Sequence, residues 1–348
     1  MTPADLSLTV LHAVRRAVDD GVLHVEVPQR VTVERPRPGG RGDYASNVAL
    51  TLARAAQRPP LDVAAILRDR LHRSPGIAAV EITGPGFLNF SLDANAQQDL
   101  VREILRRRSR YGHLAPSGQV AQPVHRADVR AAVTADAVRR ILVSQGYLVR
   151  IACEDAVDPE WALLGVPSAV QGARGHLPTD IAPLPVHRRS PRELVHTLGV
   201  DAARWGLLSV AGHDHARVGD ELLRQHEDNP LFRVQYSHSR ARALTRNAEQ
   251  LGFHSEAGHS SIEGSLPRVL GDHPAVLAAA ARHRAPDRVA RHLEVVADAL
   301  LDFQHTVLPL GDEKPSAAHR SRLALAEAAG VVLAGGLSLL GISAPDQI

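Results

Sequence analysis

One segment of the 348-residue chain, residues 228–240, combines arginine and tyrosine side chains at helical spacing. Asn229 before Pro230 predicts a helix start, because proline is accepted in the first turn and the asparagine side chain can accept a backbone N–H. Beyond this start, small and apolar residues recur at three- and four-residue spacing and predict a buried face: Val234, Ser237, Ala241 and Leu244. The opposite face is predicted to be exposed to solvent and carries Arg233, Tyr236, Arg240 and Arg242. Such a face is suited to contact phosphates and to stack on a base.

The same segment, Asp-Asn-Pro-Leu-Phe-Arg-Val-Gln-Tyr-Ser-His-Ser-Arg, resembles the signature that opens the anticodon-binding helical domain of arginyl-tRNA synthetases. Residues 322–345 resemble the closing helix and tail of that domain. The resemblance implies an all-α, DALR-type helical bundle over residues 201–348. It also implies tRNA as the partner, arginine tRNA above all, with Arg233, Tyr236 and Arg240 in contact with it.

Residues 1–115 alternate helical and strand patterns and predict a small α+β domain. The helices are expected at 4–21, 46–56 and 61–74, and the strands at 22–27, 31–34, 77–83 and 87–92. Two motifs, residues 42–50 and 84–90, resemble the amino-terminal appended domain of the same family. The resemblance implies that Phe87 and Asn89 contact an unstacked base of the tRNA elbow, because a ring stacks on a base and an amide reads its edge. Alternation predicts that Leu88, Phe90 and Leu92 are core and that Phe87 and Asn89 face outward, although a purely structural role for this strand stays open.

Residues 116–200 predict a reduced α/β remnant of a Rossmann-like catalytic domain. A helix at 134–145 and a strand at 148–152 form one βαβ-like unit, whereas a nucleotide crevice needs two βαβαβ halves. His125, Arg126, Ala127 and Asp128 stand where the family has His-Ile-Gly-His, and Arg188 and Arg189 stand where it has a lysine loop. Asp128 would bring negative charge beside a polyphosphate, and an arginine fork does not replace a mobile lysine. We therefore expect these positions to be degenerate, with no catalytic residue and no cofactor.

The charge distribution is a mild electrostatic footprint for an anionic partner, so shape and specific contacts would have to contribute to binding. The net charge is +2, and the basic surplus lies in residues 1–115, with 16 arginines against 12 acidic residues. Cys153 is the only cysteine, which excludes a disulfide, and His213-Asp214-His215 is a chance spacing among nineteen histidines, so no metal is expected. The sequence has no apolar run of the roughly 18 residues that a membrane span needs and no basic, signal-like start. We expect a cytoplasmic protein without a membrane partner.

Three functions fit these patterns. The leading hypothesis is a tRNA-binding protein without a functional aminoacylation site. The second is a shortened or repurposed arginine–tRNA ligase or amino-acid-activating enzyme, whose candidate residues are His125, Arg126, Arg188 and Arg189. The third is a protein-interaction role, as a partner or subunit of a synthetase or biosynthetic enzyme or through self-association, because a surface can keep its fold after losing its ligand.

Overall fold

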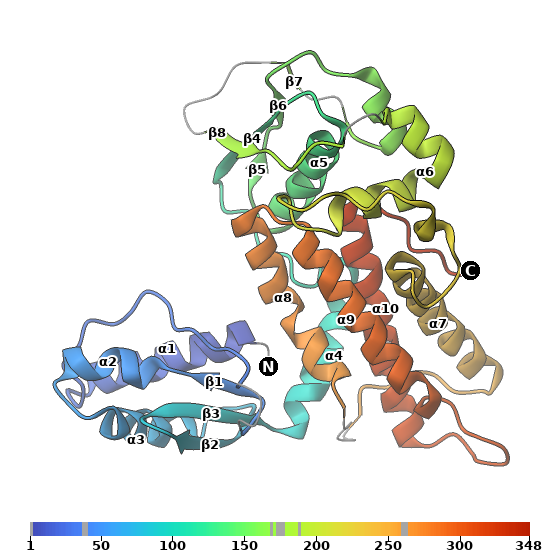
Figure 1. Ribbon diagram of the computed structural model, residues 1–348. Helices are drawn as coiled ribbons and strands as arrows, with labels where there is room; N and C mark the ends of the chain where they lie inside the picture. Colours follow the sequence, from blue (N-terminus) through green and yellow to red (C-terminus); the bar gives the residue numbers. More distant parts are fainter. Residues whose placement is uncertain (1–2, 37–40, 168–169, 172–177, 187–188, 259–263) are drawn as a thin grey trace. The chain divides into compact units, whose positions relative to one another are not determined.

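The computed structural model describes residues 3–36, 41–167, 170–171, 178–186, 189–258 and 264–348 (Figure 1). The chain divides into two compact units. The first comprises residues 1–103 with 257–263, and the second comprises residues 104–256 with 264–348. The domain boundaries predicted after residues 115 and 200 stay predictions.

The first unit is an α+β domain, as predicted. Its elements are α1 (Pro3–Asp19), β1 (Tyr44–Ser46), α2 (Val48–Ala56), α3 (Pro60–Leu71), β2 (Ile77–Thr83), β3 (Phe87–Leu92) and the first turns of α4 (Ala94–Arg107). The strands form an antiparallel sheet in the order β1-β3-β2. The apolar residues Leu6, Val10 and Val14 of α1 enter the core together with Leu88 and Phe90 of the central strand.

The strands predicted at residues 22–27 and 31–34 were wrong. The described chain there forms only one isolated bridge, between Glu34 and Ala45. Leu23 and Val31 are nevertheless buried, so their apolar character serves the core rather than a strand ladder. Pro28 lacks a backbone N–H and interrupts any ladder between them.

The second unit begins with a small parallel sheet, the expected partial α/β region. Its elements are η1 (Arg108–Arg110), β4 (Val120–His125), α5 (Val129–Ser144), β5 (Leu148–Val149), β6 (Ala152–Cys153), η2 (Pro159–Leu164), β7 (Val170–Gln171) and β8 (Pro178–Ile181). β4 is central and pairs in parallel with β5, β6 and β8. Helix α5 begins five residues earlier than predicted, because the Asp128 carboxylate caps it by accepting the backbone N–H of Ala131 at 3.0 Å.

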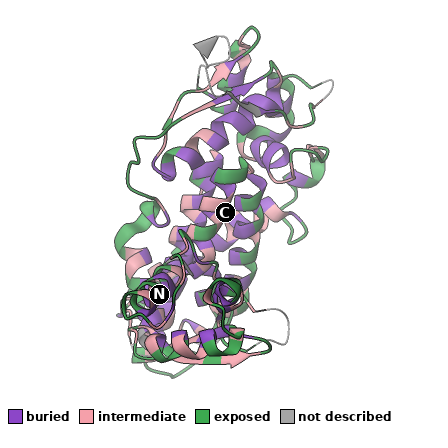
Figure 2. Cartoon of the chain, turned by 90° about the vertical axis from the view of Figure 1, so that its left-hand side faces the viewer, coloured by how far each residue is buried: buried purple, intermediate pink, exposed green. Residues whose placement is uncertain are grey.

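The rest of the second unit is a helical bundle, also as predicted. It contains α6 (Pro191–Leu208), η3 (Asp220–Leu223), α7 (Pro230–Gln250), α8 (Leu266–His283), α9 (Asp287–Phe303), η4 (Gln304–Thr306) and α10 (Ala317–Leu340). Helix α10 packs against α7, α8 and α9. It is long and apolar enough to cross a membrane, but 72% of its most apolar window is buried inside the protein, which is the behaviour of a core helix. Buried residues line these helices, whereas the loops are largely exposed (Figure 2).

A glycine divides α6 into two helical pieces. Gly199 has φ 75° and ψ 171°, a conformation that side-chain-bearing residues rarely adopt. The kink places Asp201 at the start of the second piece. There its carboxylate accepts the backbone N–H of Ser343 at 3.1 Å and the side-chain amide of Gln235 at 3.0 Å. Asp201 thereby fixes the C-terminal tail and α7 to α6.

A buried arginine of α5 holds the parallel-sheet region to the loops around α6. The Arg130 side chain is fully enclosed, with 1% of the residue exposed. Its guanidinium donates to backbone carbonyl oxygens at distances of 2.6–3.5 Å; they belong to Leu184, Leu207, Val210, Ala211 and Asp214. One side chain therefore satisfies a group of main-chain acceptors that belong to two separate stretches of chain.

A second buried arginine, Arg204 of α6, connects three elements. Its guanidinium donates to Asp136 Oδ2 of α5 at 2.8 Å, to the carbonyl of Leu340 at the end of α10 at 2.8 Å, and to the carbonyl of Leu164 at 2.7 Å. Asp136, which is fully buried, also accepts Arg139 at 2.9 Å and Arg140 at 3.0 Å. Burial alone would raise the pKa of Asp136, but these arginines more than reverse that effect and hold the pKa below its ordinary value.

Candidate functional site

The turn between β4 and α5, where a nucleotide site is expected, has its backbone donors occupied by carboxylates. Asp128 accepts the N–H of Ala131 in the first turn of α5, and Asp155 Oδ2 accepts the N–H of Ala127 at 3.3 Å. A helix N-terminus binds phosphate through such N–H groups, which point at the ligand. In this turn two carboxylates accept backbone N–H groups of the kind that bind phosphate at other helix starts.

His125, at the end of β4, is turned into the protein. Only 2% of the residue is exposed, its Nδ1–H donates to the carbonyl of Arg126 at 2.8 Å, and its ring lies 5.4 Å from that of Trp161. Burial lowers the pKa of His125, against the opposing effects of the Arg126 carbonyl and Asp128. A neutral, enclosed imidazole of this kind contributes to packing. Arg126 and Ala127 are exposed beside it.

The segment predicted to stand in place of the family's lysine loop is described only in part. Arg188 lies outside the described residues, and Arg189 is exposed. Immediately after it, Ser190 and Glu193 form a capping box at the start of α6, with Ser190 Oγ accepting the Glu193 N–H at 3.2 Å and Glu193 accepting the Ser190 N–H at 2.8 Å. Residues 190–193 therefore act as a helix start.

On α7 the predicted buried face is confirmed, since Val234, Ser237, Ala241 and Leu244 are all buried. The opposite face is less free than expected. The Arg233 guanidinium forms ion pairs with Asp298 at 2.8 Å and Glu294 at 3.8 Å, both on α9. Burial raises the pKa of Glu294, and Arg233 opposes this shift. The charge of Arg233 is thus already shared with α9 when no RNA is bound.

Tyr236 and Arg240 follow Arg233 along the same side of α7 and are half-buried. The Tyr236 ring stacks on Phe232, with centroids 5.6 Å apart and planes 20° apart. Arg240 Nε donates to Gln304 Oε1 at 2.8 Å. The three predicted contact residues therefore lie together on one helix, and the Phe232–Tyr236 pair forms an aromatic platform of the kind on which bases stack.

The two residues predicted to contact the tRNA elbow both lie on β3, but they differ in exposure. Phe87 is 40% exposed at the tip of the β2–β3 hairpin. The prediction that Asn89 faces outward was wrong, because this residue is only 5% exposed and its amide donates to Thr83 Oγ1 at 2.7 Å. β3 is the central strand, and Asn89 is flanked by Ala45 on β1 and Glu81 on β2, which shield it.

Sequence reasoning missed several residues that the fold brings together. Asp155 was not connected with the β4–α5 turn, since nothing in its spacing signals a capping role. Glu327 was also missed, although it is the only acidic residue within the apolar helix α10. A single carboxylate in such a helix was the available signal, because charged groups are seldom placed in a core without a reason.

Comparison with known proteins agrees with this architecture. The family model described as arginyl-tRNA synthetase N-terminal domain matches residues 8–92, and the one described as DALR anticodon-binding domain matches residues 234–348. The chain is 30% identical to the arginine–tRNA ligase of Frankia alni over 552 residues and 28% identical to that of Renibacterium salmoninarum over 549 residues, with the whole of each chain covered.

The fold is shared with solved synthetase structures. The chain matches Thermus thermophilus arginyl-tRNA synthetase with a TM-score of 0.70 at 16% identity, covering 100% of both chains. It matches Plasmodium falciparum arginyl-tRNA synthetase with a TM-score of 0.69 at 9% identity, covering 99% of both. This chain belongs to the arginyl-tRNA synthetase family.

Proposed function

We propose that this chain is a tRNA-binding member of its family that lacks a functional aminoacylation site, with arginine tRNA as the expected ligand. The observation that carries the proposal is the pair of carboxylates, Asp128 and Asp155, on the backbone donors of the β4–α5 turn. ATP would have to displace both before its phosphates could reach those donors, and its own charge would be repelled by them.

Other features support the same conclusion. The alignment with the Frankia relative extends over 552 positions, whereas this chain has 348 residues, so many aligned positions have no residue here. The chain's only lysine, Lys314, lies between η4 and α10 and is remote in sequence from the β4–α5 turn. In contrast, the aromatic platform of α7 and the exposed ring of Phe87 are available for RNA.

Two assays on RNA-free protein test the proposal together. Filter binding should give preference for arginine tRNA over other tRNAs, with affinity that falls steeply as salt rises, because phosphate contacts release counterions. Arginine-dependent ATP–pyrophosphate exchange should give no signal. Equal affinity for every RNA would refute recognition of tRNA, and a clear exchange signal would favour the second hypothesis, a shortened or repurposed ligase.

The third hypothesis, a protein-interaction role, predicts a different outcome. A partner, or a second copy of this chain, would then co-purify after RNA has been removed, and tRNA affinity would be negligible. Size-exclusion chromatography with light scattering on nuclease-treated protein separates this result from tRNA binding. The expected result is recovery of tRNA binding without a stoichiometric protein partner.

A further inference from the structure

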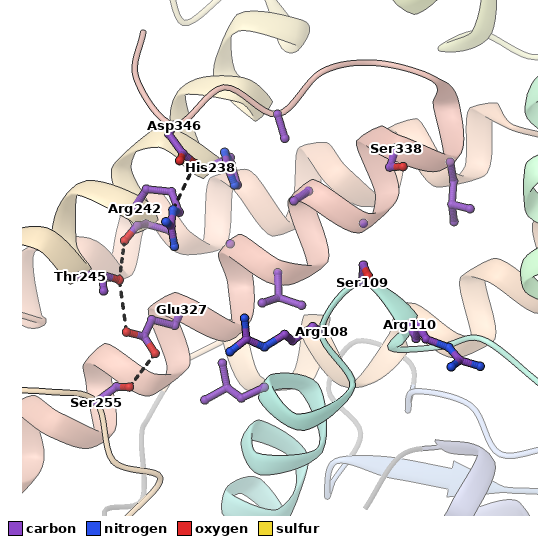
Figure 3. A pocket seen from close by; sticks show the side chains of 18 of the residues that line it. Arg108, Ser109, Arg110, His238, Arg242, Thr245, Ser255, Glu327, Ser338 and Asp346 are labelled. Atoms are coloured by element: carbon purple, nitrogen blue, oxygen red, sulfur yellow. Dashed lines mark hydrogen bonds and ion pairs between the residues drawn. The ribbon is translucent and has the colours of Figure 1, made fainter. Parts of the chain in front are cut away.

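The second unit contains a pocket of about 910 Å³ that neither the degenerate turn nor the Phe232–Tyr236 platform uses (Figure 3). Residues of η1, α7, α10 and the C-terminal tail around Asp346 line it. The tail is held in place by an Arg242–Asp346 ion pair at 3.1 Å and by His238 Nδ1–H, which donates to the carbonyl of Pro345 at 3.0 Å. The volume lies within the range of small-molecule sites, roughly 300–1,000 Å³.

The carboxylate of Glu327 is the principal acceptor in this pocket. It accepts Ser255 Oγ at 2.6 Å and Thr245 Oγ1 at 3.2 Å, and within the described part of the chain it has no ion pair with a cation. A carboxylate offers about four lone-pair positions, so two neutral hydroxyl groups leave room for further donors. A half-buried carboxylate without a counter-ion is costly, and that cost falls if a ligand supplies N–H groups.

Two cationic side chains lie at the same pocket. Arg108 and Arg110 of η1 are exposed, and neither guanidinium has a hydrogen bond or ion pair among the residues that the structure describes. Figure 3 shows Arg108 extending toward Glu327 without forming an ion pair with it. Arg108 also has φ 49°, a left-handed conformation that costs an L-residue roughly 1–2 kcal/mol. Cations and a carboxylate that share a pocket without pairing leave space for a ligand that carries both a donor edge and an anionic group.

Small and apolar residues complete the lining. Ala334 and Gly335 of α10 are small, and Leu105, Val331 and Leu339 add apolar side chains that can contact a ring. The lining therefore combines apolar contacts, an acceptor at one place and unpaired guanidinium groups at another. A planar heterocycle linked to a phosphate has the same arrangement of groups.

We propose that this pocket binds a guanine nucleotide, with the base edge on Glu327 and the phosphate on Arg108 and Arg110. Guanine presents two adjacent N–H donors, N1–H and the N2 amino group, which match the two oxygens of a carboxylate. Adenine presents a ring acceptor beside its amino group, which a carboxylate repels. The guanine nucleotide can be free in solution or an unpaired residue of an RNA, since both have the same chemistry. The inference does not depend on the proposed recognition of tRNA.

Isothermal titration calorimetry on the RNA-free full chain tests the inference, with GMP, AMP, guanosine, L-arginine and two short unpaired oligoribonucleotides, one containing guanine and one with adenine in its place. GMP should bind at least tenfold more tightly than AMP, and removal of the phosphate, as in guanosine, should weaken binding. Tighter binding of the guanine oligonucleotide than of GMP would indicate RNA as the source, and the reverse would indicate the free nucleotide. Equal binding of GMP and AMP, absence of binding at millimolar GMP, or binding of L-arginine alone would overturn the assignment.

Three variants locate the site. Glu327→Gln should lower GMP affinity at least tenfold while AMP affinity is kept, because an amide presents a donor to the guanine edge. Arg108→Ala should weaken GMP binding about tenfold and leave guanosine binding unchanged. Glu249→Gln, an exposed acid of α7 outside the pocket, is the matched control and should behave as wild type. Circular dichroism checks the fold of each variant, and unchanged GMP binding by a folded Glu327→Gln protein would refute the site. Filter binding of tRNA to the same variant reports on the proposed function separately.

Discussion

Replacing Asp136 with alanine should destabilise the second unit far more than any exposed acid would. Asp136 and Arg204 are both fully buried, and their atoms are 2.8 Å apart. Removing one partner of a buried pair leaves an uncompensated charge and costs about 3–5 kcal/mol. The pairs with Arg139 and Arg140, whose side chains are 31% exposed, add only about 0.5 kcal/mol each. We expect a total loss of about 5 kcal/mol in the free energy of unfolding.

Urea denaturation followed by far-UV circular dichroism measures this loss, with Asp228→Ala as the control. Asp228 is an exposed residue of the same unit and should change the free energy of unfolding by less than about 1 kcal/mol. Adding Arg204→Met to Asp136→Ala should recover part of the stability, because an apolar pair avoids the buried charge. A loss below 1 kcal/mol for Asp136→Ala, or a double variant as unstable as the sum of the single ones, would refute the assignment of Asp136 as counter-ion.

Three further predictions concern tRNA affinity, acid stability and the α6 kink. Tyr236→Ala should weaken tRNA binding about tenfold in filter binding, since a stacked base contributes about 1–3 kcal/mol, whereas Tyr147→Ala on the parallel-sheet region should not. His273 is fully buried between Tyr111 and His292, and this burial holds its pKa well below 6.5. Its contribution to the free energy of unfolding is therefore complete above pH 6.5 and is lost as the pH falls below that value, by at most about 1.4 kcal/mol per pH unit. Denaturation between pH 7.5 and 5 should therefore be less pH-dependent for His273→Phe than for wild type, and parallel curves would contradict this account. Gly199→Ala should raise the free energy of the folded state by at least about 1 kcal/mol, because φ 75° strains a residue with a Cβ, and an unchanged urea midpoint would argue against it.

The sequence predicted the parts of the fold that depend on local pattern. The buried face of α7 follows from helical periodicity, and the Asn229 cap is present as expected, with its Oδ1 accepting the N–H of Leu231 at 3.1 Å. Asn89 could not be placed correctly, because its burial depends on the strands on either side of β3 rather than on alternation within it. Arg233 was predicted free because Glu294 and Asp298 lie about sixty residues away, on a helix whose docking no local pattern reports. The departure of residues 125–128 from the His-Ile-Gly-His pattern was visible in the sequence, but the hydrogen bond from the Ala127 N–H to Asp155 depends on the folded loop.

The hydrogen bonds from Arg130 to backbone carbonyl oxygens limit how far a chain of this architecture can be shortened. Five main-chain oxygens between residues 184 and 214 receive donors from this one side chain. A variant of this chain without α5 would need other donors for these five carbonyl oxygens before the remaining elements could pack together. Helix α5 therefore has a role in solvating the main chain that is independent of any chemistry at the β4–α5 turn.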